Sequence, residues 1–145
     1  MAVWTNAANV GSRACAGCHS EIYRKYMATG MARSSGRVGS GSFTENLSVP
    51  VAGKSAGATY RVTRGSDSYR MSFSRPQAGV TGVRELKWFI GSGSVGRSYL
   101  FEVEGFLFQA PVSYYSSVAR WDLSPGYADK QNIDLAKPVE EPCLY

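Results

Sequence analysis

Cysteine and histidine occupy only four positions in this chain of 145 residues, and three of the four lie together. Residues 15–19 read CAGCH and hold Cys15, Cys18 and the only histidine, His19. The pattern C-x-x-C-H is the attachment signature of a c-type haem. Residues i and i+3 of a helical turn share a face, so both thiols can reach the vinyl groups along one edge of a porphyrin. The motif therefore predicts haem c as the cofactor, Cys15 and Cys18 as its covalent anchors, and His19 as the proximal iron ligand.

Three other interpretations of these residues are possible. A disulfide between Cys15 and Cys18 would leave the adjacent histidine without a role. A thioredoxin-like redox pair requires a βαβ context, which the surrounding sequence lacks. Zinc bound by Cys15, Cys18, His19 and Cys143 has the right number of ligands, but adjacent cysteine and histidine ligands make a poor tetrahedral chelate. A zinc-stabilised, β-rich binding module therefore stays open as an alternative.

The hydrophobic pattern changes period along the chain and predicts a single domain over residues 1–145. A helical pattern covers residues 12–34 and includes the haem-attachment motif. A Gly/Ser-rich connection follows over residues 35–57, and alternation typical of strands covers residues 58–115. Within that stretch, hairpins are expected to turn at residues 65–67 and at 104–105, the second ending near Pro111. Residues 116–145 are expected to form a loop-rich tail.

Together these segments predict an α+β fold. It comprises a short N-terminal haem-bearing helix followed by an antiparallel β-meander.

Residues 91–96 read GSGSVG and match the G-x-G-x-x-G pattern of dinucleotide-binding loops. Such a site requires a helix directly after the glycines. Residues 97–104 alternate instead as a strand. The segment is therefore expected to close two strands and to bind no nucleotide.

Composition excludes two further classes of protein. No apolar run approaches the ~18 residues that a membrane-spanning helix requires. The net charge of +5 comes from arginines that alternate along predicted strands and form no stripe, which argues against a nucleic-acid surface. Arg13 lies two residues before the first cysteine and is a candidate partner for a haem propionate, because arginine suits planar carboxylates.

The sixth iron ligand is the least determined part of the site. One histidine cannot supply a bis-histidine pair within one subunit, and methionine is the next choice in electron-transfer haems. Met27 shares a helix with His19, and Met71 occupies a core-facing strand position where a packing role is expected. Met31 follows Gly30, where the chain can reverse, and is the preferred candidate. An open sixth position stays the alternative.

Several segments resemble the multihaem cytochrome c554-like family. The similarity covers residues 11–23, continues through 26–34, and returns in the β-rich segments 89–100, 111–115 and 124–127. Many relatives carry a distal haem-ligating histidine where this chain has Met31, so the resemblance implies an iron-ligand role there and also ligation of a neighbouring haem. Longer relatives carry a second C-x-x-C-H after the β segment. By that likeness, Cys143 is expected to be a stranded thiol in a fragment of a longer cytochrome.

The expected function is electron transfer by a c-type cytochrome whose single haem iron cycles between Fe(II) and Fe(III), and not catalysis. The expected partners are redox proteins, including other cytochromes, and self-association is left open. The alternative is a haem-based sensor or catalyst of small molecules at an open sixth position. No secretory signal begins the chain. Because covalent haem attachment is extracytoplasmic, a mature or trimmed form in the bacterial periplasm, or secreted to the cell surface, is expected.

Overall fold

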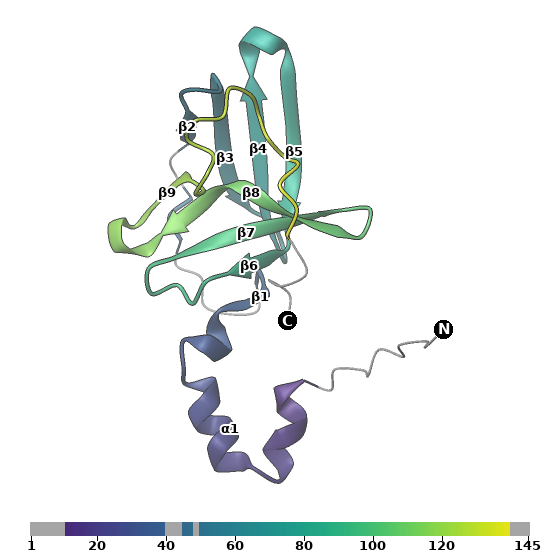
Figure 1. The fold of residues 1–145 in the computed structure, drawn as a ribbon, viewed down its shortest axis with the longest axis vertical. Coiled ribbons are helices and arrows are strands. Elements are labelled where there is room, and N and C mark those ends of the chain that lie inside the picture. The colour runs from purple at the N-terminus through teal and green to yellow at the C-terminus, as the bar shows by residue number, and fades with distance from the viewer. Residues whose placement is uncertain (1–10, 40–44, 48–49, 140–145) are drawn as a thin grey trace.

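The structure is a computed structural model that describes residues 11–39, 45–47 and 50–139 (Figure 1). Within these residues, the strands form two antiparallel sheets. The five-stranded sheet has the order β1 (Ser35–Arg37), β6 (Trp88–Ile90), β7 (Gly96–Val103), β8 (Phe106–Tyr115) and β9 (Arg120–Leu123). The four-stranded sheet has the order β2 (Val51–Gly53), β3 (Ala58–Arg64), β4 (Tyr69–Arg75) and β5 (Val80–Leu86).

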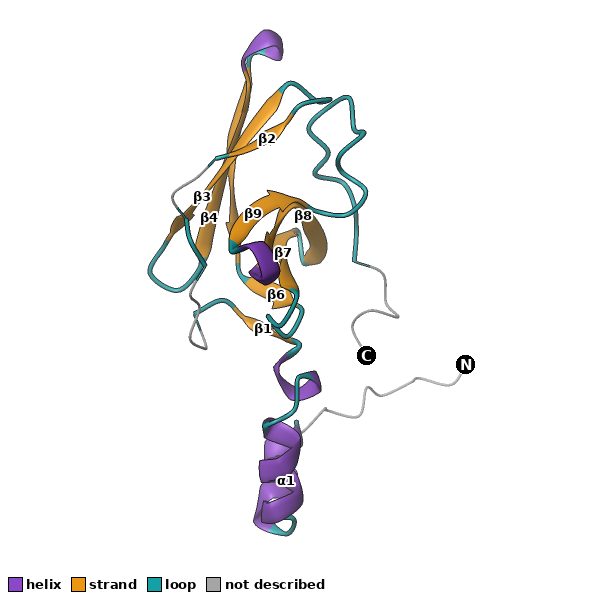
Figure 2. Ribbon diagram, turned by 90° about the vertical axis from the view of Figure 1, so that its left-hand side faces the viewer, coloured by secondary structure: helices purple, strands orange, loops and turns teal. Residues whose placement is uncertain are grey.

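The core lies between the two sheets, whose strands run across one another (Figures 1 and 2). Along β3 and β4 every second side chain is buried, as the period-two pattern predicts. Val62 lies opposite Met71 in the β3–β4 register, and both are buried. The expected hairpin over this stretch is therefore confirmed, and its inward residues form part of the core.

The α+β assignment is wrong, because the structure is mostly β and has two antiparallel sheets where a single meander was expected. The chain leaves the four-stranded sheet after β5 and enters the other at Lys87, whose amide donates a hydrogen bond to the Leu100 carbonyl (3.1 Å). Residues 85–90 therefore include both the end of β5 and the whole of β6. Strand β9 also lies in the segment expected to be loop.

The expected N-terminal helix is likewise broken into three pieces. A 3₁₀-helix η1 (Ser12–Gly17) precedes α1 (Ser20–Met27), and a short 3₁₀-helix η2 (Met31–Arg33) follows. The two further 3₁₀ turns, η3 (Pro76–Ala78) and η4 (Ser116–Val118), connect strands. We call residues 11–34 the helical hairpin, and the two sheets with residues 124–139 the β-body.

The loop at residues 91–95 joins β6 to β7, which pair as antiparallel neighbours with Ile90 opposite Ser98. A strand follows the glycines, so the expected strand-closing role is confirmed. The hairpin between β7 and β8 also turns where expected, because Glu104 and Gly105 both have positive φ (51° and 82°), as a two-residue type I′ turn requires.

Strand β8 continues past Pro111, where its hairpin was expected to end. The β7–β8 register shifts between Ser98 and Leu100, opposite the proline. Proline has no amide hydrogen to donate to a neighbouring strand. Within a strand it is therefore tolerated where the register is irregular, as it is here.

Residues 124–139 fold back over the two sheets. The Tyr127 hydroxyl donates to the Gln109 carbonyl (2.9 Å), and Ile133 and Leu135 pack against the core. Pro138 forms an isolated antiparallel bridge with Phe108. Among the described residues, no helix is long and apolar enough to cross a membrane.

Candidate functional site

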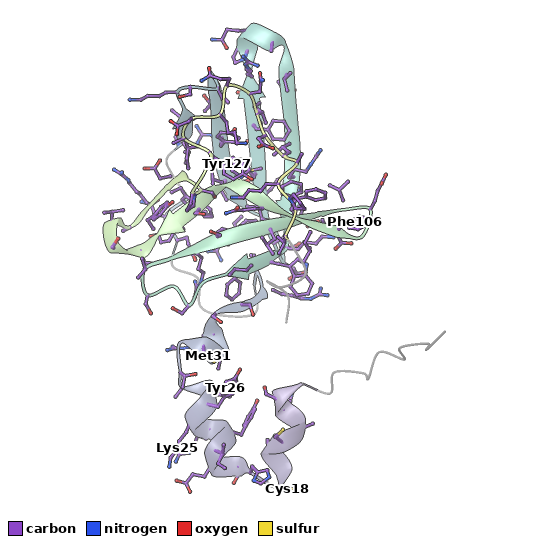
Figure 3. The ribbon with its side chains drawn as sticks, viewed as in Figure 1. Cys18, Lys25, Tyr26, Met31, Phe106 and Tyr127 are labelled. Atoms are coloured by element: carbon purple, nitrogen blue, oxygen red, sulfur yellow. The ribbon has the colours of Figure 1, made fainter. Side chains whose placement is uncertain are left out.

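The C-x-x-C-H motif lies at the tip of the helical hairpin that points away from the sheets (Figure 3, where Cys18 is labelled). The Cys15 carbonyl accepts hydrogen bonds from the backbone amides of Cys18 and His19, the second at 2.9 Å. This tight turn joins η1 to α1. The His19 carbonyl then accepts the Tyr23 amide (2.9 Å) and begins the α-helix. Cys15, Cys18 and His19 are therefore held on one turn of backbone.

All three side chains that the motif assigns to haem are exposed, and both thiols are free. None of the three short helices of the hairpin contains a buried residue. The donor set of two free thiols and one imidazole on a single exposed turn fits covalent attachment of a haem. Arg13 is also exposed, in η1, and its role as a propionate partner stays a prediction.

An apolar stripe continues from His19 along α1. It includes Ile22 (66% exposed), Tyr26 (40%) and Met27 (40%), which lie three, seven and eight residues after His19. Such spacing places side chains on one face of a helix. An eight-residue helix is too short to be stable in water by itself, because most helical stability in proteins comes from packing of the apolar face. This stripe packs against no core in the part of the chain that the structure describes.

Met31 lies at the opposite end of α1 from His19, next to the sheets (Figure 3). An eight-residue helix is about 12 Å long, at 1.5 Å per residue. Axial ligands of one iron must both lie within bonding distance of it, so this arrangement does not bring Met31 and His19 together on one iron. Met31 is 76% exposed and is open to a group from outside the chain.

The other candidates of the sequence lie elsewhere. Met71 is fully buried between the sheets, as its expected packing role requires. Cys143 lies outside the described residues. Among residues 11–39, 45–47 and 50–139, no three histidine, cysteine or acidic side chains converge as a metal site. The zinc alternative therefore gains no support from the described geometry.

The helical hairpin joins the β-body at the loop of residues 91–95, which we call the glycine loop. The Gly91 amide donates to the Ser34 carbonyl (2.6 Å). Arg33 donates from Nε to the Thr29 carbonyl and from Nη2 to the Ala28 carbonyl, both at 3.3 Å, and so caps the end of α1. At this junction lies a polar pocket of about 480 Å³, lined by residues that include Arg33, Glu45, Ser92, Arg97 and Tyr114.

A buried carboxylate at this junction was missed by the sequence analysis. The side chain of Glu45 is 2% exposed, and its Oε1 accepts hydrogen bonds from Arg97 Nη1 (2.9 Å) and the Tyr99 hydroxyl (2.8 Å). Its Oε2 accepts the Tyr69 hydroxyl (3.0 Å). Glu45 lies in the Gly/Ser-rich stretch, far from its partners in sequence. Its only signal was that it is an isolated acidic residue in a basic region.

Comparison with known proteins identifies no relative of this chain. No protein-family model, no curated protein and no solved structure matches the chain. The likeness to cytochrome c554-like proteins therefore stays a resemblance of motifs, and the geometry of the chain itself carries the functional argument.

Proposed function

We propose that this chain is a c-type cytochrome that binds one covalent haem on its helical hairpin and transfers electrons. Cys15 and Cys18 would form the thioether bonds, and His19 would bind the iron. The haem would supply the Fe(II)/Fe(III) couple. The observation that carries the proposal is the complete C-x-x-C-H motif on one exposed turn with both thiols free.

The apolar stripe of α1 supports the same proposal. Ile22, Tyr26 and Met27 leave a helix face exposed beside His19. A large apolar ring system attached at residues 15–19 would lie close enough to pack against such a face. Burial of apolar surface contributes roughly 25 cal/mol per Å², which would stabilise a helix too short to persist alone. The chain would thus supply attachment, axial ligation and apolar cover.

Redox proteins, including other cytochromes, would be the partners of such a carrier. The site of action would be extracytoplasmic, in the bacterial periplasm or at the cell surface, because covalent haem attachment takes place there. The exposed hairpin tip would give a partner direct access to the cofactor.

The proposal is tested by producing the chain with an export signal in a bacterial host that carries the c-type maturation machinery. The purified protein should give a pyridine haemochrome spectrum of the c type, and the haem should remain bound after acid–acetone extraction. Cys15→Ser combined with Cys18→Ser should abolish this retention. Cys143→Ser is the matched control, because it also removes a thiol, and it should retain the haem fully.

A second candidate function, binding of small molecules at an open sixth position, is favoured by the location of Met31. The structure separates Met31 from His19 by the length of α1. An electron carrier with a His/Met haem should show the sulfur-to-iron charge-transfer band in its oxidised spectrum, and Met31→Ala should abolish it. If the band is absent in the unmodified protein and carbon monoxide binds the ferrous form readily, the open-site function replaces electron transfer.

A further inference from the structure

Glu45 is an unusual group for the interior of a small β-fold. Transfer of a carboxylate away from water costs several kcal/mol unless partners compensate. Here the compensation comes from one guanidinium and two phenols, Arg97, Tyr99 and Tyr69, at 2.9, 2.8 and 3.0 Å. One buried carboxylate thus accepts a hydrogen bond from each of two buried tyrosines.

These two tyrosines belong to a cluster of four aromatic side chains in contact. The ring centroids of Tyr69 and Tyr99 are 5.5 Å apart, and those of Tyr99 and Trp121 are 4.9 Å apart. Trp121 also contacts Tyr69 (5.9 Å) and Tyr114 (5.7 Å). Tyrosine and tryptophan are the aromatic side chains that are most readily oxidised by one electron.

Tyr114 connects this cluster with the surface. It lines the polar pocket at the junction with the hairpin, together with Glu45 and Arg97. A continuous series of ring contacts therefore leads from the pocket through Tyr114 and Trp121 to Tyr99 and Tyr69.

We propose that Tyr69 and Tyr99 form a redox-active tyrosine pair for which Glu45 is the proton acceptor. The oxidant is a peroxyl radical or an outer-sphere one-electron oxidant that reaches the pocket. The electron passes from a tyrosine through Trp121 and Tyr114 to the oxidant, which becomes the hydroperoxide anion or the reduced complex. The phenolic O–H bond breaks, its proton moves to the Glu45 carboxylate, and a neutral tyrosyl radical remains.

The hydrogen bonds decide where the radical resides. A phenol becomes a strong acid as it loses an electron, so its proton moves in the same step to a base in hydrogen-bond contact, which Tyr69 and Tyr99 both have in Glu45. The Trp121 Nε1 atom is buried and has no hydrogen-bond partner among the described residues. Trp121 thus passes the electron without trapping the radical. This chemistry is independent of the haem proposal, because every side chain that it requires lies in the two sheets or in the connection before β2, outside the helical hairpin.

The test uses the full chain and an excess of photogenerated ruthenium(III) tris-bipyridine, so that any more easily oxidised group is exhausted first. Electron paramagnetic resonance should detect a tyrosyl signal that outlives the radicals of exposed tyrosines. Tyr69→Phe combined with Tyr99→Phe should abolish this long-lived signal. Glu45→Gln keeps an acceptor oxygen but is not a base, and it should slow radical formation about a hundredfold, the typical contribution of a positioned proton acceptor.

Tyr127 supplies the matched control. It is 4% exposed, as buried as the pair, but its hydroxyl donates to the Gln109 carbonyl, which is too weak a base to keep a proton. Tyr127→Phe should leave the long-lived signal unchanged. Loss of the signal in Tyr127→Phe, or its survival in the double variant, would overturn the proposal.

A measurement on the unmodified chain covers the case in which a Glu45 variant does not fold. Radical formation should be slower in deuterium oxide, because the proton moves to Glu45 in the same step as the electron. Equal rates in the two solvents would also contradict the proposal.

Discussion

The helical hairpin and the β-body are built in opposite ways. In the β-body, two sheets enclose a core that includes Met71, Tyr99 and Phe101, each no more than 1% exposed. The helices of the hairpin have no buried residue, although its α-helix carries an apolar stripe. The β-body thus contains what stabilises it, whereas the helical hairpin leaves an apolar face and the side chains of Cys15, Cys18 and His19 exposed. This contrast is what a cofactor-binding segment attached to a self-sufficient scaffold would produce.

Two methionines provide the strongest contrast between the regions. Met71→Ala should lower the free energy of unfolding by about 3 kcal/mol, because it leaves a cavity between the sheets. Met31→Ala should change it by under ~0.5 kcal/mol, because a 76% exposed side chain leaves no cavity. Urea denaturation of the chain prepared without haem measures both. Equal losses of unfolding free energy in the two variants would mean that the helical hairpin packs into the same core as Met71.

The glycine loop at the junction should be sensitive to a single methyl group. A Cβ at Gly91 would lie 2.5 Å from the Gly96 carbonyl oxygen, at a φ of +113° that L-residues rarely adopt. Gly91→Ala should therefore cost about 2 kcal/mol, from backbone strain together with the clash. Gly79→Ala is the matched control, since Gly79 also has positive φ (62°) but no atom within 4 Å of its Cβ position. It should cost about half as much.

Urea denaturation measures the loss of unfolding free energy in Gly91→Ala and in Gly79→Ala. Similar losses in the two variants would show that backbone strain alone determines the cost at Gly91. The backbone would then have moved to remove the clash with the Gly96 carbonyl. In that case the glycine loop would not be rigid where the helical hairpin joins it.

The smallest expected effect concerns residues 124–139, which cover the two sheets. The Ala136 amide donates to Asp134 Oδ1 (3.0 Å), and Lys130 Nζ lies 2.9 Å from Oδ2; these contacts lower the pKa of Asp134 below its ordinary 3.8. A lowered folded-state pKa stabilises the protein above the unfolded value, and this contribution is lost as the pH falls through the folded value. Asp134→Asn should therefore cost under ~1 kcal/mol at pH 7. The difference from the unmodified chain should shrink below pH 4, as thermal denaturation across pH would show.

The sequence predicted local structure better than it predicted the whole fold. Period-two alternation located the β3–β4 hairpin, and the positions of Gly65 and Gly105 located two turns, because these signals depend on neighbouring residues. The passage from one sheet to the other at Lys87 has no local signal. It arises from the packing of strands that are distant in sequence, and for that reason a single meander was expected.

The candidate site divides in the same way. The C-x-x-C-H motif is local, so Cys15, Cys18 and His19 could be selected from sequence alone. The Glu45 cluster could not, because its members come from β4, β7 and the connection before β2 and meet only when both sheets are formed. The location of Met31 beyond the end of α1 likewise depends on where the helix breaks.

The mass of the intact polypeptide tests the central claim most directly. The full chain, exported by a host with the c-type maturation machinery, should be heavier than its sequence by the mass of one haem, and fragmentation should assign the addition to residues 15–18. An unmodified mass with both thiols still free to react with an alkylating agent, from a host that matures a control cytochrome in the same culture, would contradict the account.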